Sequence, residues 1–297
     1  WGGLIGTLLA GPIADSFGRR FLIMLSCMVF ILGATFIVSA HQFATLLVAR
    51  VFLGIGVGIV AVAVPLYVTE LVPIEHRGKY VTFFQLFLTF GIVLAYVVDY
   101  YFLPTGNWHA MFMVILIPAT ILLVGMFFLP ESPRWLMIKQ KESRAHDILA
   151  QLYGRTRADN IQQEIRTSLS EVAPCWRDFM SRSVMLPLLL SIFIAMLNQW
   201  TGINSFLQYA PVLLKQAGIA SNQIAMLGSI GIGLLNFVVT VIALLLVDRV
   251  GRRALLLIGL IGVVASEVFL GALYFMPLSP MTNGLASLVG LFAFIVF

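Results

Sequence analysis

The chain carries one short motif at two distant places, GPIADSFGRR at residues 11–20 and DRVGRR at residues 248–253. Each copy places an acid, a turn glycine and paired arginines between two long apolar runs. A unit repeated on the same side of the membrane is typical of proteins built from parallel repeats, whose halves are related by an axis along the membrane normal. The motif therefore predicts two related halves.

The apolar runs around the motif are long enough to cross a lipid bilayer as helices. A hydrocarbon core about 30 Å thick needs about 20 helical residues, whereas barrel strands need about 10 alternating ones. We expect seven full spans and two partial spans in this chain. They cover residues 1–14 (partial), 21–40, 43–69, 80–98, 108–129, 184–214, 223–247, 254–276 and 284–297 (partial).

The overall composition excludes a water-soluble enzyme. The 297 residues are 60% hydrophobic and only 10% charged, against about 25% charged in soluble domains. The two cysteines imply no disulfide framework, and none of the four histidines has the spacing of metal ligands. The sequence therefore predicts a membrane protein with no metal and no cofactor, and the net charge of +5 requires no nucleic-acid partner.

Basic residues decide the orientation of the spans. If the loops after the first, third, fifth and seventh spans are cytosolic, 16 of the 18 lysines and arginines lie inside. This is the arrangement that the positive-inside rule selects. We expect a multi-pass protein of the plasma (inner) membrane.

The segment 131–183 divides the chain. It holds 16 of the 31 charged side chains, and spaced apolar residues at 142–153 and 159–172 predict short amphipathic helices. We therefore expect an N-terminal bundle at residues 1–130, a cytosolic connector at 131–183 and a C-terminal bundle at 184–297.

Further motifs give the chain a resemblance to a known family. They are RVFLGIGVG at 50–58, PLYVTE at 65–70, ELVPIEHRG at 70–78, PESPRWL at 130–136 and NQWTGIN at 198–204. With these motifs in this order, together with the paired hairpins, the chain resembles the sugar porter family of the major facilitator superfamily.

This resemblance implies an all-α membrane protein with the major facilitator fold, in which two helical bundles are related by pseudo-two-fold symmetry. The family has twelve spans, so we expect this chain to be a fragment that runs from the second span into the tenth. The resemblance also implies alternating access to a site between the bundles. A proton-coupling carboxylate, where the family has one, sits on the first span.

Uncharged amides lie deep within the apolar runs, where a polar group is costly unless it has a partner. An amide both donates and accepts hydrogen bonds, as sugar hydroxyls do, so a set of amides predicts a polar cavity for a ligand. The candidate substrate-binding residues are Gln85, Asn198, Gln199, Asn204, Gln208 and Asn236. The resemblance implies sugar contact for Gln85, Gln199, Asn204 and Asn236. The alternative is hydrogen bonding between helices, at about 0.6–2 kcal/mol per contact.

The sixth span needs a bend for its amides to meet. Gln199 and Asn204 are five residues apart and do not share a face of a straight helix, so we expect Gly202 to permit a bend. Two residues depart from the family pattern, because Asn198 replaces a glutamine and Gln208 replaces a tyrosine. These departures leave the identity of the sugar open.

Charged residues suggest two further sites. Arg50 lies within a span and needs an anionic or dipolar partner there, and Gly54 and Gly58 let another backbone approach the same face. The resemblance implies that Arg50 faces the acid of the first span, in a proton-coupling or gating role. It also implies a cytosolic charge latch, whose candidate residues are Asp15, Arg19, Arg20, Glu70, Arg77, Glu131, Arg134, Asp248, Arg249 and Arg252.

The sequence thus predicts transport of a monosaccharide (a hexose, a pentose or a similar polyol), either as proton symport or as passive diffusion. Its expected partners are the sugar, the lipid bilayer and, in symport, protons. Two alternatives remain open. One is a transporter-like sugar sensor, and the other is a transporter of a non-sugar organic solute.

Overall fold

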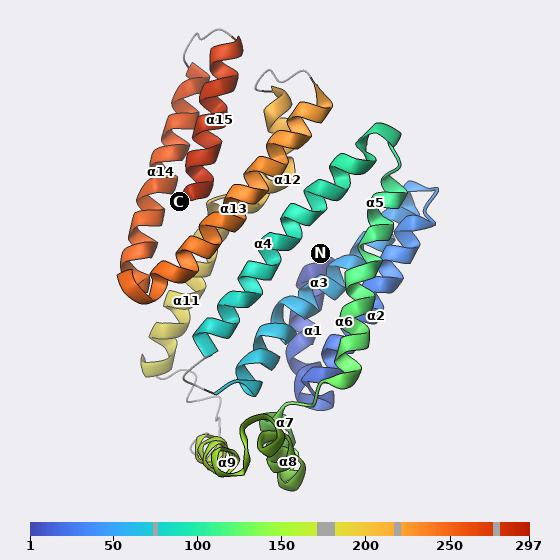
Figure 1. Ribbon diagram of the computed structural model, residues 1–297, viewed down its shortest axis with the longest axis vertical. Coiled ribbons are helices and arrows are strands. Elements are labelled where there is room, and N and C mark those ends of the chain that lie inside the picture. The colour runs from blue at the N-terminus through green and yellow to red at the C-terminus, as the bar shows by residue number, and fades with distance from the viewer. Residues whose placement is uncertain (74–76, 171–181, 217–220, 276–279) are drawn as a thin grey trace. The chain divides into compact units, whose positions relative to one another are not determined.

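A computed structural model describes residues 1–73, 77–170, 182–216, 221–275 and 280–297, and these residues are almost entirely helical (Figure 1). The chain divides into two compact units. One comprises Trp1–Phe84 and Asn107–Pro174, and the other comprises Gln85–Gly106 and Cys175–Phe297. The long helix α4, Arg77–Phe102, contributes to both units. The predicted bundle boundaries at residues 130 and 183 stay a prediction.

Seven helices of the described residues are long and apolar enough to cross a membrane, which confirms the seven full spans. They are Arg19–Val38, Phe43–Leu71, Tyr80–Thr105, Trp108–Phe128, Val184–Lys215, Asn222–Val247 and Arg253–Leu273. The expected partial spans are also helices, α1 (Gly2–Phe17, 16 residues) and α15 (Pro280–Val296, 17 residues). The chain is therefore an all-α membrane protein.

In the first unit, α2 (Arg19–Val38) and α1 both pack on α3 (Phe43–Leu71). Glycines let α1 and α3 approach closely. A Cβ atom on Gly58 would lie 2.2 Å from the carbonyl oxygen of Gly3, and one on Gly54 would lie 2.9 Å from the nitrogen of the same residue. Only a residue without a side chain fits at such a crossing. The predicted close approach at Gly54 and Gly58 is confirmed.

The predicted span 108–129 is two helices, α5 (Trp108–Val114) and α6 (Leu116–Phe128), which meet at Ile115. The reason is Pro118, which has no N–H to pair with the carbonyl of Val114 four residues earlier. Both helices pack on α2. The interruption does not change the number of spans.

The connector contains three described helices, α7 (Pro133–Ile138), α8 (Glu142–Tyr153) and α9 (Arg155–Ser170). The predicted helix at 142–153 is confirmed, and the predicted helix at 159–172 begins four residues earlier because α8 ends at Gly154 (φ 81°) and α9 follows directly. Residues 171 and 172 lie outside the described residues. The short α7 was not predicted, and the side chain of Ser132 caps it by accepting from the N–H of Trp135 at 3.3 Å.

The second unit contains most of α4, the 3-10 turn η2 (Leu103–Thr105) and five further described helices. These are α11 (Arg182–Trp200), α12 (Ile203–Gln216), α13 (Asn222–Val250), α14 (Arg252–Phe275) and α15. The core of this unit centres on buried apolar residues of α12, α13 and α15, with Ile92 of α4 packed against them. This core holds α12 and α13 together, and these helices carry three of the predicted substrate-binding residues.

Candidate functional site

The six predicted substrate-binding amides all belong to the second unit. Gln85 lies on α4, Asn198 and Gln199 near the end of α11, Asn204 and Gln208 on α12, and Asn236 in the middle of α13. The side chain of Asn236 is half-buried and those of the other five are exposed. These amides are therefore not sealed into dry contacts between helices of their own unit.

The break between α11 and α12 brings two of the predicted amides, Gln199 and Asn204, together. α11 ends at Trp200, α12 begins at Ile203, and Gly202 between them has φ +72°, a left-handed conformation that favours glycine. Across this break the side-chain N–H of Asn204 donates to Oε1 of Gln199 at 3.0 Å. The predicted bend at Gly202 and the pairing of the two amides are confirmed.

This pairing leaves complementary groups on the same surface. An amide has two N–H donors and an oxygen with two lone pairs. Because the bond uses one donor of Asn204 and one lone pair of Gln199, the NH₂ group of Gln199 and the Oδ1 atom of Asn204 keep hydrogen-bonding capacity. Gln208 lies one helical turn after Asn204 on the same face of α12. The break thus presents donors and acceptors side by side, as a polyol requires.

The hydroxyl groups near Gln85 are satisfied within their own helix. Thr82 donates to the carbonyl of Gly78 at 2.8 Å, and Thr89 donates to that of Leu86 at 2.9 Å. On α13, Thr240 likewise donates to the carbonyl of Asn236 at 2.7 Å. These bonds use the hydroxyl donors of the three threonines, whereas the amide of Gln85 is exposed on α4.

Arg50 contacts an aromatic ring, that of Phe112, which was not predicted from the sequence. Its guanidinium carbon lies 5.0 Å from the centroid of the Phe112 ring on α5. The face of an aromatic ring carries negative charge density, so it stabilises the Arg50 cation, which forms no ion pair with a carboxylate of the described residues. No sequence signal connects these positions, because Phe112 lies within an apolar run like many other phenylalanines of this chain.

Glu131 is the centre of a charged cluster in the first unit. Its Oε1 atom accepts from the backbone N–H groups of Arg19 and Arg20, both at 3.0 Å, and from that of Ser132 at 2.9 Å. The first two groups are free donors at the start of α2, where an anion is stabilised by the helix dipole. Gly18 permits this approach, since a Cβ atom there would lie 2.5 Å from Oε2 of Glu131.

The two arginines after Gly18 have different partners. Arg19 is buried, and its side chain contacts carboxylates of Glu70 (Nε to Oε2, 2.9 Å) and Asp15 (3.3 Å). Arg20 instead donates to the carbonyls of Met126 (2.9 Å) and Phe127 (3.0 Å), at the end of α6. A cation at a helix C-terminus satisfies free carbonyls there.

Four further groups, which were not predicted, complete the cluster. Ser132 donates from its hydroxyl to Glu70, the Tyr67 hydroxyl donates to the carbonyl of Pro130, and the Trp135 indole N–H donates to the carbonyl of Asp15 at 3.1 Å. On α8, Tyr153 donates to the carbonyl of Leu71 at 2.7 Å. Burial raises the pKa of the Tyr153 phenol above its usual value, with a smaller contribution from Tyr80. Only the serine has a sequence signal, as a helix cap before Pro133.

Part of the residue set predicted as a cytosolic charge latch therefore lies together in the first unit, and its role as a latch stays a prediction. Asp15, Arg19, Arg20, Glu70 and Glu131 form one network within the first unit. Arg134 is half-buried on α7, and Arg249 is exposed on α13. The side chains of Arg77, Asp248 and Arg252 lie outside the described part of the chain. Pairing between the two copies of the repeated motif stays a prediction.

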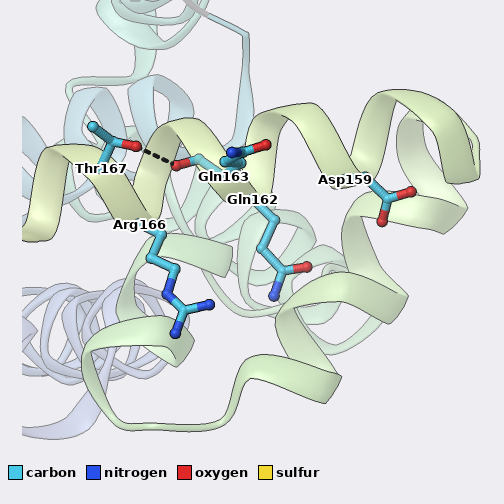
Figure 2. Close-up of a pocket in the computed structure, with 5 residues that line it drawn as sticks. All are labelled: Asp159, Gln162, Gln163, Arg166 and Thr167. Atoms are coloured by element: carbon cyan, nitrogen blue, oxygen red, sulfur yellow. Dashed lines mark hydrogen bonds between the residues drawn. The ribbon is translucent and has the colours of Figure 1, made fainter.

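Two cavities of the described residues lie away from the amides. One, of about 560 Å³, is lined by polar residues of α9, and Figure 2 shows Gln162 and Arg166 projecting from the same face of that helix. The other, of about 590 Å³, is a mainly apolar groove along α14 and α15. Neither cavity includes a predicted substrate-binding residue.

Comparison with known proteins gives consistent matches along the whole chain. A family model described as "Sugar (and other) transporter" matches residues 1–297. The glucose transporter GlcP of Staphylococcus epidermidis is 35% identical over 100% of this chain and 66% of its own length. The galactose-proton symporter of Escherichia coli strain K12 is 34% identical over 92% of this chain and 59% of its own length. The chain thus spans about three fifths to two thirds of these relatives.

Solved structures agree. The proton:xylose symporter XylE bound to 6-bromo-6-deoxy-D-glucose superimposes with a TM-score of 0.86 and 30% identity, over 99% of this chain and 66% of XylE. A partially occluded, inward-open structure of XylE from E. coli gives a TM-score of 0.84 at 29% identity, over 99% and 70% of the two chains. The fold is that of the major facilitator superfamily, whose members named here are transporters and not enzymes. The chain belongs to the family of sugar (and other) transporters.

Proposed function

We propose that this protein transports a monosaccharide across a membrane by alternating access. The observation that carries the proposal is the Gln199–Asn204 amide pair at the break between α11 and α12. Neutral donors and acceptors beside each other suit a sugar, which is uncharged and presents hydroxyl groups that both donate and accept. Relatives described as glucose, galactose and xylose transporters support the same substrate class.

The remaining amides complete the proposed site. Gln208 adds a side chain one turn along α12, while Gln85 and Asn236 supply amides from α4 and α13. Helices broken within the membrane are typical places for substrate binding in transporters, because the break frees polar groups to face a cavity. Asn198, which is one methylene shorter than the glutamine usual in the family, would reach less far and alter the choice of sugar.

We place the connector in the cytosol and the protein in the plasma membrane. Support comes from the 16 of 18 basic residues that this orientation puts inside. The network around Arg19 and Glu131 then lies on the cytosolic side, at the start of α2. Pairing of this network with Arg249 and its neighbours would close that side, and only several ion pairs together bias such an equilibrium, since one exposed pair contributes about 0–1 kcal/mol.

The test is uptake by the full-length protein reconstituted in liposomes, with radiolabelled glucose, galactose, xylose and arabinose as probes. Gln199→Ala should abolish saturable uptake, because it removes the amide that pairs with Asn204 and faces the sugar. Gln163→Ala, an exposed glutamine on α9, is the matched control and should keep wild-type uptake. Normal uptake by Gln199→Ala would refute the proposed site.

Proton coupling is tested in the same vesicles. Symport predicts uptake that rises when the outside is acidified relative to the lumen, whereas passive diffusion predicts no dependence on the gradient. Relatives described as proton symporters support the first outcome. Saturable sugar binding without uptake would instead indicate a sensor, and uptake of an organic anion but of no sugar would indicate a different solute.

A further inference from the structure

A proline within α12 leaves one backbone carbonyl without its helical partner. In an α-helix the carbonyl of residue i pairs with the N–H of residue i+4, so the partner of Leu207 would be residue 211. That residue is Pro211, which lies inside α12 and has no N–H to donate. Leu207 is itself buried in the core of the second unit, away from water.

The hydroxyl of Tyr96 supplies the missing donor. It comes from α4 and donates to the carbonyl oxygen of Leu207, in a buried contact. Unpaired backbone groups are costly in an apolar environment, and prolines are tolerated in membrane helices where a neighbouring group satisfies the freed carbonyl. The bond therefore ties α4 to α12 at the carbonyl inside α12 whose helical donor Pro211 removes.

A glycine on a third helix fixes the tyrosine ring. A Cβ atom on Gly233 of α13 would lie 2.9 Å from Cδ2 and 3.1 Å from Cε2 of Tyr96. The ring thus fills the space that a side chain on α13 would occupy. α12 and α13 pack side by side (Figure 1). The ring therefore contacts two helices that share a core.

The three contact residues lie close in sequence to the predicted sugar-binding amides. Leu207 is three residues after Asn204, and Gly233 is three residues before Asn236, so each lies one turn from an amide. Tyr96 is eleven residues, or about three turns, after Gln85 and therefore on the same face of α4. A shift of α12 relative to α4 at Leu207 would move Asn204 relative to Gln85.

We propose that Tyr96 is a positioning residue for the sugar site. Its hydroxyl replaces the hydrogen bond that Pro211 removes, and this bond holds α12 at one position beside α4 and α13. This inference rests on the proposed function. Without the hydroxyl, α12 is stable only where the Leu207 carbonyl finds another donor. The binding-competent population then falls, and the apparent affinity for sugar falls by the same factor.

The experiment compares Tyr96→Phe, Pro211→Ala and the double variant in the full-length protein, with KM and Vmax measured for the best-transported sugar of the four probes. Tyr96→Phe should raise KM about tenfold, the penalty expected for an unpaired buried carbonyl. Pro211→Ala alone should stay within about twofold of wild type, because the carbonyl can accept from both donors. In the Pro211→Ala background, Tyr96→Phe should also have no more than about a twofold effect, because the backbone N–H restored at position 211 donates to the Leu207 carbonyl.

A matched control variant and a second pair of variants at Gly233 test the same role of Tyr96. Tyr101→Phe, at a 75% exposed tyrosine further along the same helix, should leave KM unchanged. Gly233→Ala should raise KM as Tyr96→Phe does, by displacing the ring, and should add little in a Tyr96→Ala background that leaves room for the methyl group. These glycine variants decide the matter if Pro211→Ala does not fold.

Failure of the inference and failure of the proposed function are distinguishable. Wild-type KM in Tyr96→Phe, or an equal effect of Tyr96→Phe with and without Pro211, would overturn the role of Tyr96 while sugar transport stands. Absence of saturable uptake of all four sugars by the wild-type protein would overturn both.

Discussion

Gly18→Ala is expected to destabilise the protein far more than the same change at Gly251, although both glycines occupy the same place in the repeated motif. The backbone angles are alike, with φ 99° and ψ 162° at Gly18 and φ 87° and ψ 148° at Gly251. This region is essentially restricted to glycine, so each alanine costs about 1–3 kcal/mol of backbone strain. The surroundings of the two residues differ.

At Gly18 the new methyl group would lie 2.5 Å from Oε2 and 2.8 Å from the carboxyl carbon of Glu131, whereas at Gly251 none of the described atoms would lie within 4 Å of it. The carboxylate must move away, and it then loses its bonds to the N–H groups of Arg19 and Arg20. A hydrogen bond to a charged group contributes about 1.5–3 kcal/mol, and water partly compensates at this half-buried site. Gly18→Ala should therefore cost about 2–4 kcal/mol more than Gly251→Ala.

The assay is denaturant unfolding of the purified full-length protein in detergent, followed by tryptophan fluorescence. Trp135 is a suitable reporter because its indole donates to the carbonyl of Asp15 beside the cluster. In a Glu131→Ala background the extra cost at Gly18 should disappear and leave only the strain seen at Gly251. Equal destabilisation by the two glycine variants in the wild-type background would refute the argument.

Two further predictions concern the same unit. Arg19→Met should lower the free energy of unfolding by about 3–5 kcal/mol, because the Glu70 carboxylate, only 7% exposed, loses its cation. Changing both Arg19 and Glu70 to methionine should lower the free energy of unfolding by less in the same assay. An equal or larger loss in the double variant would contradict this reasoning. Tyr153→Phe should cost about 1 kcal/mol at neutral pH, where the bond to Leu71 is intact. The folded state raises the pKa of Tyr153 above the unfolded value of 10.0, so this tyrosine stabilises the protein below pH 10 and that contribution is lost as pH rises through the folded-state pKa. The variant should therefore show a shallower alkaline loss of stability than wild type, and parallel pH profiles would show that Tyr153 does not cause that loss.

The spans were predictable because lipid imposes a length that sequence displays directly. The seven apolar runs of about 20 residues or more correspond to seven helices of the described chain. The helix α7 was not predicted, because six residues are too short for a periodic pattern and its signal is confined to the Ser132 cap and Pro133. The interruption at Ile115 was not predicted, because the run is uniformly apolar and its hydropathy does not show that Pro118 removes a helical hydrogen bond.

The amide pair at Gly202 was predictable for a different reason. Gln199 and Asn204 are five residues apart, so one local bend is enough to join them, and glycine is the residue that permits it. The position of the remaining amides relative to this pair depends on how helices pack. Their role in sugar binding stays a prediction.

Sequence alone determined the number of spans and the local bend at Gly202, since each depends on residues within a few turns of one another. Tertiary structure decided which distant groups satisfy one another. Phe112 beside Arg50 is one such partner, and Tyr96, which donates to a carbonyl 111 residues away, is another. Each of these contacts depends on which faces of two helices meet. Most helices of this chain are apolar on nearly every face, so the sequence pattern does not show which face packs against which neighbour.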